Sequence, residues 1–536
     1  RSFRADRASL LLDELGLARQ HLRQHLFERR KFCDSKERLK KLQAFVAADD
    51  TEADLDRKMI AVIARADQPE WFTILRTLFH AYTEKEPGQQ LDLDIPPPAW
   101  EQLEKFDLDA PFWQGVKTLF GYTEEIPNLR NLLIRMFVTD FAHHLKGEVP
   151  IAYQNLVLPP SGRRNVIVCL AQWRDSASRG SSYDRIAADI ARRISLENHL
   201  HNRELDVLMD VKTFFDVEKA IVRSLRDRVT STAEIINSDD VRVIASRRQG
   251  GHWASPMSVG WSEIPRKALH AAYDALVAAA EFYRLRNGYA GGFDFESATA
   301  LYQSYETDLY RFDQLYRLVC EAADEAEAQG WGLLKPLREA IEAVYAHWYL
   351  PKLSLAWGQF VGQLLEKWRI ERVPNQQGFF EKVVRHRLNE ADRRRVFVII
   401  SDGFRYEAAQ ELARDLNGKY RFQAELSTML GVLPSYTALG MAALLPHKQI
   451  GYKPDAGDVQ VDGLSTAGLA QRNEVLARED GMAVRADELL ALKKEDGREL
   501  VRAKQVVYVY HNTIDATGDD AKTEKETFQA VRRAID

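Results

Sequence analysis

Carboxylates at the ends of two predicted strands are the residues of this chain best suited to chemistry. The stretch "VFVIISD" ends in Asp402, and "YHNTIDATGDD", which follows a second apolar run, contains Asp515 and Asp519. Divalent cations bind clustered carboxylate oxygens held by a rigid scaffold. In a parallel sheet, the carboxyl ends of the strands share one edge, and ligands bind there. The pattern therefore predicts a metal site made of Asp402, Asp515 and Asp519.

A hydroxyl in a third segment could complete a site for phosphate esters. Thr437, in "LPSYTALGMAALLP", stands at the start of a predicted short helix, where backbone N–H groups and the helix dipole favour an anion. An alcohol is a poor nucleophile at neutral pH, and coordination to a metal activates it. Gly518 is expected to let a D-x-x-G-D loop turn tightly, so that Asp515 and Asp519 face one ion.

Each of these residues also has a structural interpretation. Asp402 precedes a predicted helix, where aspartate commonly accepts backbone N–H bonds as a cap. Thr437 could cap its helix in the same way, and Ser435 competes with it for either role. Asp515 and Asp519 could form a solvated turn, since Asp and Gly are frequent turn residues. The motifs alone leave both interpretations open.

Two neighbours of the predicted site carry side chains that could take part. Arg405, three residues after Asp402, could contact a phosphate or be a surface arginine in the first turn of a helix. His511 stands at the predicted strand end within reach of the site. A histidine there is more simply explained as a structural residue with both ring nitrogens hydrogen-bonded.

The elements that would position these residues begin at about residue 390. "RVFVII", "RFQAELSTM" and "KQVVYVYHN" have the apolar or alternating pattern of strands. "RYEAAQELARDL", "TALGMAALL" and "EKETFQAVRRAI" have the pattern of helices. Strands that alternate with helices indicate a largely parallel α/β sheet.

The preceding part of the chain is predicted to be mainly helical. Leu11, Leu15, Leu22 and Leu26 would share one face of a long amphipathic helix. "KGEVPIAYQNLVLPPSGRRN" has the Pro and Gly content of a linker, and "VIVCLAQW" could be a short buried strand or an extended loop. We therefore expect an α plus α/β fold, with helical domains at 1–148 and 149–388 and an α/β domain at 389–536.

Composition limits the function classes. The 536 residues are 45% hydrophobic and 29% charged with a net charge of −5, as in a globular protein without a global field for nucleic acid. Three scattered cysteines argue against a disulfide framework or a Cys-based zinc site and indicate a cytoplasmic protein. No apolar run predicts a membrane partner. The first residue, Arg1, and the helical pattern at Asp536 suggest a fragment of a longer protein.

The last quarter of the chain resembles a known family. The stretches "IISDGFRYEAAQEL", "LGVLPSYTALGMAALLP", "VDGLSTAGLAQR" and "VYVYHNTIDATGDD" are similar to the PglZ family, a branch of the alkaline phosphatase superfamily found in phage-defence systems of the BREX and phage growth limitation types. The resemblance implies a partial alkaline phosphatase-like α/β domain after a long helical N-terminal region.

The resemblance also implies roles for single residues. Asp402 would be a metal ligand, Thr437 the nucleophile and a metal ligand, and Asp515 and Asp519 the ligands of a second metal. This chain departs from the superfamily pattern in two places. Asp519 stands where many members have a histidine, which favours manganese or magnesium over zinc. The later Asp-His pair and final histidine of the superfamily have no counterpart before Asp536, so the parent protein would have to supply them.

The function implied is a metal-dependent phosphoesterase, a phosphodiesterase or nuclease in anti-phage defence, with two divalent ions (zinc, manganese or magnesium). The helical region would bind other BREX proteins, and DNA would be a further partner or the substrate. The alternative is a scaffold subunit with little or no catalytic turnover.

Overall fold

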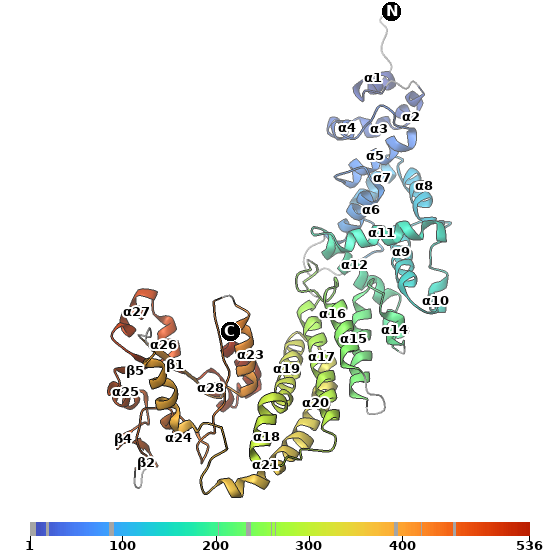
Figure 1. Ribbon diagram of the computed structural model, residues 1–536. Coiled ribbons are helices and arrows are strands. Elements are labelled where there is room, and N and C mark those ends of the chain that lie inside the picture. The colour runs from blue at the N-terminus through green and yellow to red at the C-terminus, as the bar shows by residue number, and fades with distance from the viewer. Residues whose placement is uncertain are drawn as a thin grey trace, which may run out of the picture. The chain divides into compact units, whose positions relative to one another are not determined.

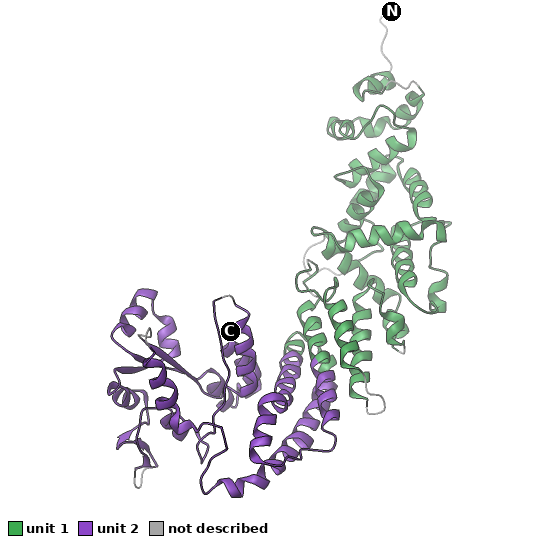
Figure 2. Ribbon diagram, in the orientation of Figure 1, with its two compact units in different colours: residues 1–277, 325–334 green, residues 278–324, 335–536 purple. Residues whose placement is uncertain are grey.

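The computed structural model describes residues 7–17, 21–84, 91–201, 203–231, 237–258, 260–262, 264–390, 395–419, 421–453 and 457–536. Over these ranges the chain is mostly helical, and its strands belong to the C-terminal part (Figure 1). The chain divides into two compact units, unit 1 (1–277 and 325–334) and unit 2 (278–324 and 335–536) (Figure 2). All residues of the predicted site belong to unit 2.

Unit 1 is assembled from helices whose apolar faces meet in a core rich in aromatic residues. Its helices are α1 (Arg7–Glu14), α2 (Leu22–Glu28), α3 (Arg30–Cys33), α4 (Lys36–Gln43), α5 (Glu52–Ala64), α6 (Trp71–His80), α7 (Pro98–Lys105), α8 (Asp109–Phe120), α9 (Leu129–His144), α10 (Ile151–Gln154), α11 (Pro160–Arg174), α12 (Gly180–Arg193), α13 (Leu196–Leu200), α14 (Leu205–Leu208), α15 (Phe215–Thr230), α16 (Ser238–Gln249) and the first half of α17 (Arg266–Gly288). In the core, the Phe137 ring lies 6.1 Å from Trp173 and 5.1 Å from Tyr183.

Two sequence expectations for residues 146–173 were wrong. "VIVCLAQW", predicted as a strand or an extended loop, lies in α11, because Pro160 occupies the first helical turn and Val166, Cys169, Leu170 and Trp173 repeat with helical spacing on the buried face. α11 and α10 also occupy much of the stretch predicted as a linker.

The single long helix predicted across Leu11 to Leu26 is two helices, α1 and α2. Gly16 adopts a φ of 69° after the end of α1, a left-handed conformation that commonly terminates helices. The leucine side chains predicted to share a face are nevertheless buried. Hydrophobic pattern thus identified the core-facing residues but not the break between the helices.

The helical part of unit 2 surrounds a buried carboxylate. It contains the end of α17 and α18 (Ala298–Ser304), α19 (Tyr310–Ala328), α20 (Lys335–Val344) and α21 (Leu350–Leu364), with π-helical turns η2 (Tyr305–Leu309) and η4 (Tyr345–Tyr349). The two π-helical turns place tyrosines around Asp313. Its carboxylate accepts hydrogen bonds from the hydroxyls of Tyr305 at 2.7 Å and Tyr345 at 2.5 Å.

The α/β part of unit 2 contains a parallel sheet with strand order β1-β6-β5. These strands are β1 (Val396–Ser401), β6 (Val506–His511) and β5 (Gly481–Arg485). A smaller antiparallel sheet has the order β2-β3-β4, with β2 (Ile450–Tyr452), β3 (Val459–Val461) and β4 (Leu464–Ser465). The helices are α22 (His386–Leu388), α23 (Tyr406–Asn417), α24 (Thr437–Ala443), α25 (Leu469–Ala477), α26 (Ala486–Ala491), α27 (Lys494–Arg502), α28 (Thr513–Asp519) and α29 (Thr527–Ile535).

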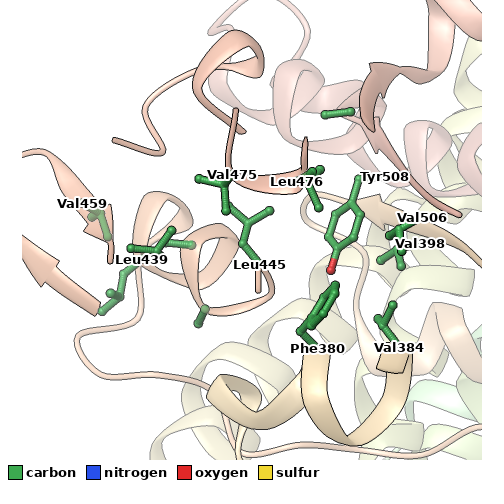
Figure 3. Close-up of a cluster of buried hydrophobic side chains, with 14 of the residues drawn as sticks. Phe380, Val384, Val398, Leu439, Leu445, Val459, Val475, Leu476, Val506 and Tyr508 are labelled. Carbon is green, nitrogen blue, oxygen red and sulfur yellow. The ribbon is translucent and has the colours of Figure 1, made fainter. Parts of the chain in front are cut away.

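One face of the parallel sheet packs on a continuous apolar core (Figure 3). Val398 of β1 and Tyr508 of β6 meet Phe380, Leu445 and Val475 there. The Tyr508 hydroxyl is satisfied by a 2.6 Å hydrogen bond to the backbone oxygen of residue 444. This core fixes β1 and β6 side by side, and with them the residues that follow each strand.

The expected α plus α/β fold class is confirmed, as are the strands at β1 and β6 and the helices at α23, α24 and α29. "RFQAELSTM", predicted as a strand, forms no strand among the described residues. Its alternating pattern is not matched by burial, since Phe422 is largely exposed. None of the described helices is both long and apolar enough to cross a membrane.

Candidate functional site

The carboxyl ends of β1 and β6 bring Asp402 and Asp515 together. The two strands pair in parallel as far as Ser401 and His511. Beyond the strand, the backbone N–H of Asp402 donates to the carbonyl oxygen of His511 at 2.9 Å. Asp515 lies in the first turn of α28, which begins directly after this strand end. Both aspartates therefore lie at the edge where parallel sheets bind ligands.

Gly403 allows the turn after Asp402 to approach α28 closely. Its φ of +75° belongs to the left-handed region that favours glycine. A Cβ at this position would lie 3.1 Å from Cγ2 of Ile514 and 3.5 Å from the backbone nitrogen of Asp515. The segment after the first strand is thus in contact with the segment that carries the second aspartate.

Electrostatic repulsion acts between these aspartates. Burial is the largest effect that raises the pKa of Asp402, and the negative charge of Asp515 is the next; Asp519 adds a smaller contribution. A hydrogen bond from the backbone of Gly403 and the positive charge of Arg472 oppose the rise. Like charges that face each other at a sheet edge disfavour ionisation unless a cation neutralises them.

The D-x-x-G-D segment was predicted to be a loop, and this prediction was wrong. Residues Thr513–Asp519 form α28, and Gly518 has a helical backbone rather than a tight turn. The spacing i, i+4 still places Asp515 and Asp519 on the same side of the helix. The helix supplies the common orientation that the sequence interpretation had attributed to glycine. Asp519 is the more exposed of the two.

Thr437 is the first residue of α24, and its side chain is exposed. The residue in the cap position is Tyr436, whose side chain makes no capping hydrogen bond. Within the described ranges, no hydrogen bond or ion pair joins Thr437 to Asp402 or Asp515. Ser435, the competing hydroxyl, is also exposed. The assignment of Thr437 as nucleophile and metal ligand stays a prediction.

His511 is a fully partnered residue between the two strand ends. Its Nδ1 lies 2.8 Å from the Ser401 hydroxyl and its Nε2 lies 2.7 Å from the Thr513 hydroxyl. Because both ring nitrogens have hydrogen-bonding partners, His511 has the structural role expected from the sequence. It links the end of β1 to the start of α28.

Arg405 faces the helical part of unit 2. Partial burial lowers the pKa of its guanidinium, but Tyr345, Asp313 and Glu407 outweigh this effect and raise it. Arg405 therefore continues the hydrogen-bonded group around Asp313 towards the start of α23. A contact between Arg405 and substrate stays a prediction.

Arg472 is a residue that the sequence interpretation could not assign. It lies in the first turn of α25, where its Nε donates to the backbone oxygen of Thr466 at 3.0 Å. Its Cζ lies 4.6 Å from the centre of the Tyr510 ring. The positive charge of Arg472 lowers the pKa of Asp402. An arginine early in a helix that precedes a parallel strand could have been placed at the sheet edge. Because β5 was not predicted, there was no reason in the sequence to place Arg472 there.

Asp462, another residue of the family-like stretch, has a structural role. Its carboxylate accepts hydrogen bonds from the backbone N–H groups of Lys448, at 3.0 Å, and Gln449, at 2.9 Å. Its φ of 49° places it in the tight connection between β3 and β4. This aspartate therefore holds the antiparallel sheet together.

The donor atoms at the sheet edge suit a hard divalent cation, though only in part. Two carboxylates from adjacent strand ends offer the oxygen ligands that magnesium, manganese and zinc accept. In the part of the chain that the structure describes, no group of three or more His, Cys, Asp or Glu side chains is arranged to hold a metal ion. Asp402 and Asp515 thus fit as an incomplete set of ligands.

The chain is similar to known proteins both in its C-terminal part and over nearly its whole length. Residues 379–536 match the family model described as "BREX system PglZ alkaline phosphatase-like domain". Over 99% of its length, the chain is 37% identical to "Alkaline phosphatase-like protein BrxZ" of Escherichia coli O9:H4 (strain HS) and 28% identical to "Alkaline phosphatase-like protein PglZ" of Bacillus cereus (strain H3081.97). The aligned segments cover 61% and 59% of these relatives.

No solved structure matches the chain. The family model covers the parallel sheet together with Asp402, Thr437, Asp515 and Asp519. The resemblance read from the motifs is confirmed, and over residues 379–536 the chain carries an alkaline phosphatase-like domain of the PglZ family.

Proposed function

We propose that this chain belongs to a metal-dependent phosphoesterase of the alkaline phosphatase type, which hydrolyses phosphodiesters in anti-phage defence. The observation that carries the proposal is the contact between the turn after Asp402 and the backbone of Asp515, which brings two mutually repelling carboxylates to one sheet edge. Such a pair is unfavourable alone and becomes favourable around a divalent cation.

Asp402 and Asp515 would hold the cation, and Asp519 would join from the same side of α28. A divalent ion held there supplies Lewis-acid polarisation of a phosphoryl oxygen and promotes deprotonation of a hydroxyl. Zinc, manganese and magnesium all accept carboxylate oxygens. A second ion requires donors in addition to these three aspartates.

Thr437 is the nucleophile of the proposed reaction. Its Oγ1 attacks phosphorus, the bond to the leaving alcohol breaks, and a phosphothreonine forms. Water then hydrolyses this intermediate, which releases the phosphate monoester and restores the hydroxyl. The exposed position of Thr437 at the start of α24 is accessible to a substrate. Ser435 is the alternative nucleophile.

A scaffold with little or no turnover is the second candidate function. Two observations favour it. No set of three metal-ligating side chains occurs among the residues the structure describes, and within the same residues no hydrogen bond joins Thr437 to the aspartates. In both cases we propose that the helical region binds other components of the defence system. DNA is the further partner, as substrate or as bound polymer.

Hydrolysis of bis-p-nitrophenyl phosphate by the full-length protein tests the enzyme against the scaffold. We expect turnover with added Mn²⁺, Zn²⁺ or Mg²⁺ and a loss of at least about 100-fold in Asp402→Ala, because one ligand of the cation is removed. Asp496→Ala, an exposed carboxylate in α27, is the matched control and should retain the activity. Equal rates for wild type and Asp402→Ala would favour the scaffold.

The same assay identifies the nucleophile. Thr437→Ala should abolish turnover, Thr437→Ser should restore part of it, and Ser435→Ala should leave it nearly unchanged. The reverse order for the two alanine variants would assign the reaction to Ser435.

A further inference from the structure

The first turn of α25 lies at the same sheet edge as the aspartate pair. α25 ends at Ala477 and β5 begins at Gly481, so the helix runs antiparallel to this strand. Because β5, β6 and β1 are parallel, the start of α25 is at their carboxyl edge. The position of Arg472 over Tyr510 agrees, since Tyr510 pairs with Ile400, two residues before Asp402.

The guanidinium of Arg472 is held in place on two sides. Its Nε donates to the backbone oxygen of Thr466, and its Cζ lies 4.6 Å from the centre of the Tyr510 ring. Burial raises the pKa of Tyr510 to about 12, so the ring is a neutral partner and the contact is a cation–π interaction. A hydrogen bond between the Arg472 and Tyr510 side chains adds to this contact. A guanidinium carries five N–H donors, so the Thr466 and Tyr510 contacts position the side chain and leave donors at its terminal nitrogens.

Arg472 is partly buried, and it differs from the fully buried Arg317 in its charged partners. No Asp or Glu among the described residues lies within ion-pair distance of it, whereas Arg317 binds three glutamates. Its charge nevertheless reaches Asp402 and lowers that pKa. A positioned cation near a carboxylate pair, but not neutralised by it, has donors available for an external anion.

We propose that Arg472 binds the non-bridging oxygens of the substrate phosphate through its terminal nitrogens. This assignment rests on the proposed function and adds to it the group that orients the phosphate. The planar fork of a guanidinium matches two phosphate oxygens, a geometry that a lysine cannot reproduce. The anion would then lie between this fork and the cation held by the aspartates.

Binding of inorganic phosphate to the full-length protein in the presence of Mg²⁺, measured by isothermal titration calorimetry, tests this assignment. Arg472→Met should weaken binding by about 10- to 100-fold, the range for lost hydrogen bonds to a charged group. Arg472→Lys keeps the charge and loses the fork, so a smaller loss is expected. Arg478→Met, at the other end of α25 and half exposed, is the control and should bind as the wild type does.

The calorimetric result separates this assignment from the proposed function. Phosphate binding that depends on Arg472, without hydrolysis of bis-p-nitrophenyl phosphate, would support the anion site and overturn the enzyme. Hydrolysis by wild type with equal phosphate affinity in both Arg472 variants would keep the enzyme and overturn the assignment. Absence of phosphate binding by the folded wild type would also overturn it. If Arg472→Met shows no thermal unfolding transition and is therefore not folded, the phosphate affinity of Arg472→Lys alone tests the assignment.

Discussion

Two carboxylate clusters lie at opposite ends of the connection between β1 and α23, and they differ in what neutralises them. In the first, the clamp cluster, Arg317 is 1% exposed and its Nε lies 3.0 and 2.9 Å from the two carboxylate oxygens of Glu407. The same guanidinium binds Glu411 at 2.5 Å and Glu321 at 2.6 Å. Arg532 adds a second cation, 3.1 Å from Glu321 and in contact with Glu411.

The second cluster is the edge cluster, Asp402, Asp515 and Asp519. Within the described ranges none of its members forms an ion pair with an arginine or lysine. In the clamp cluster two arginines pair with three glutamates and join α19, α23 and α29. The edge cluster keeps its repulsion, which costs stability and is typical of groups retained for a ligand. The difference supports the proposal that the clamp cluster serves the fold and the edge cluster serves binding.

Removal of the central cation of the clamp cluster should have the largest effect on stability. Arg317→Met leaves glutamates buried without their partner, and loss of one side of a buried pair costs about 3–5 kcal/mol. We expect a lower thermal midpoint and faster hydrogen exchange in α19, α23 and α29. Arg372→Met, which removes an exposed arginine, should change neither. A variant as stable as wild type would contradict the structural role of the clamp cluster.

Removal of a negative charge from the edge cluster should raise the thermal stability of the protein rather than lower it. The pKa of Asp402 is raised in the folded protein, so the folded state binds a proton more tightly than the unfolded chain. Stability is therefore lost as the pH rises from the usual aspartate pKa through the raised one. In chelator at neutral pH, Asp402→Asn should raise the thermal midpoint by about 1–2 °C, a small value because solvent screens this carboxylate.

The pH dependence of this gain provides its control. The difference between Asp402→Asn and wild type should shrink as the pH falls towards the ordinary aspartate value of 3.8, since the wild-type carboxyl is then protonated as well. A difference that is constant with pH would show that repulsion at the edge is not its cause. Differential scanning calorimetry of both proteins across this range measures it.

A small effect, between none and that of Asp402→Asn, is expected at the rim of the clamp cluster. Arg532 is 39% exposed, and ion pairs open to solvent contribute about 0–1 kcal/mol. Arg532→Gln should therefore lower the thermal midpoint by no more than about 2 °C. A loss as large as that of Arg317→Met would mean that Arg532, rather than Arg317, is the main counter-ion of Glu411.

The sequence predicted the elements with strong periodicity and missed those that depend on partners. β1, β6, α23 and α29 have long, regular apolar patterns and were recognised. β5, "GMAVR", is short and begins with glycine, so its pattern is not distinctive. "VIVCLAQW" is apolar and β-branched, and only its buried spacing within α11 shows that it is helical.

Burial of β1 was also predicted only in part. Its unbroken apolar run indicates a strand covered on both faces, and Val398 and Ile400 do pack into the core. Phe397 is 50% exposed and Ile399 is 70% exposed on the opposite face. The apolar character of both faces can be read from the sequence. Which face is covered depends on residues distant in the chain, and the sequence of β1 alone cannot predict them.

The candidate site was predictable where its residues follow strands, and not where helices bring them in. Asp402 and Asp515 were found because each comes directly after an apolar run. The shared face of Asp515 and Asp519 was predicted for the wrong reason, since α28 rather than a glycine turn produces it. Arg472 approaches from α25, and its place at the edge follows only from the order of the strands.

The clamp cluster has a practical consequence for dissecting this chain. The family match starts at residue 379, but two of the clamp residues, Arg317 and Glu321, precede it. A recombinant piece cut at that point would expose Glu407 and Glu411 without Arg317, on the helix that follows Asp402. The smallest piece expected to fold as a physical unit therefore begins well before the evolutionary domain, near residue 278, where unit 2 starts.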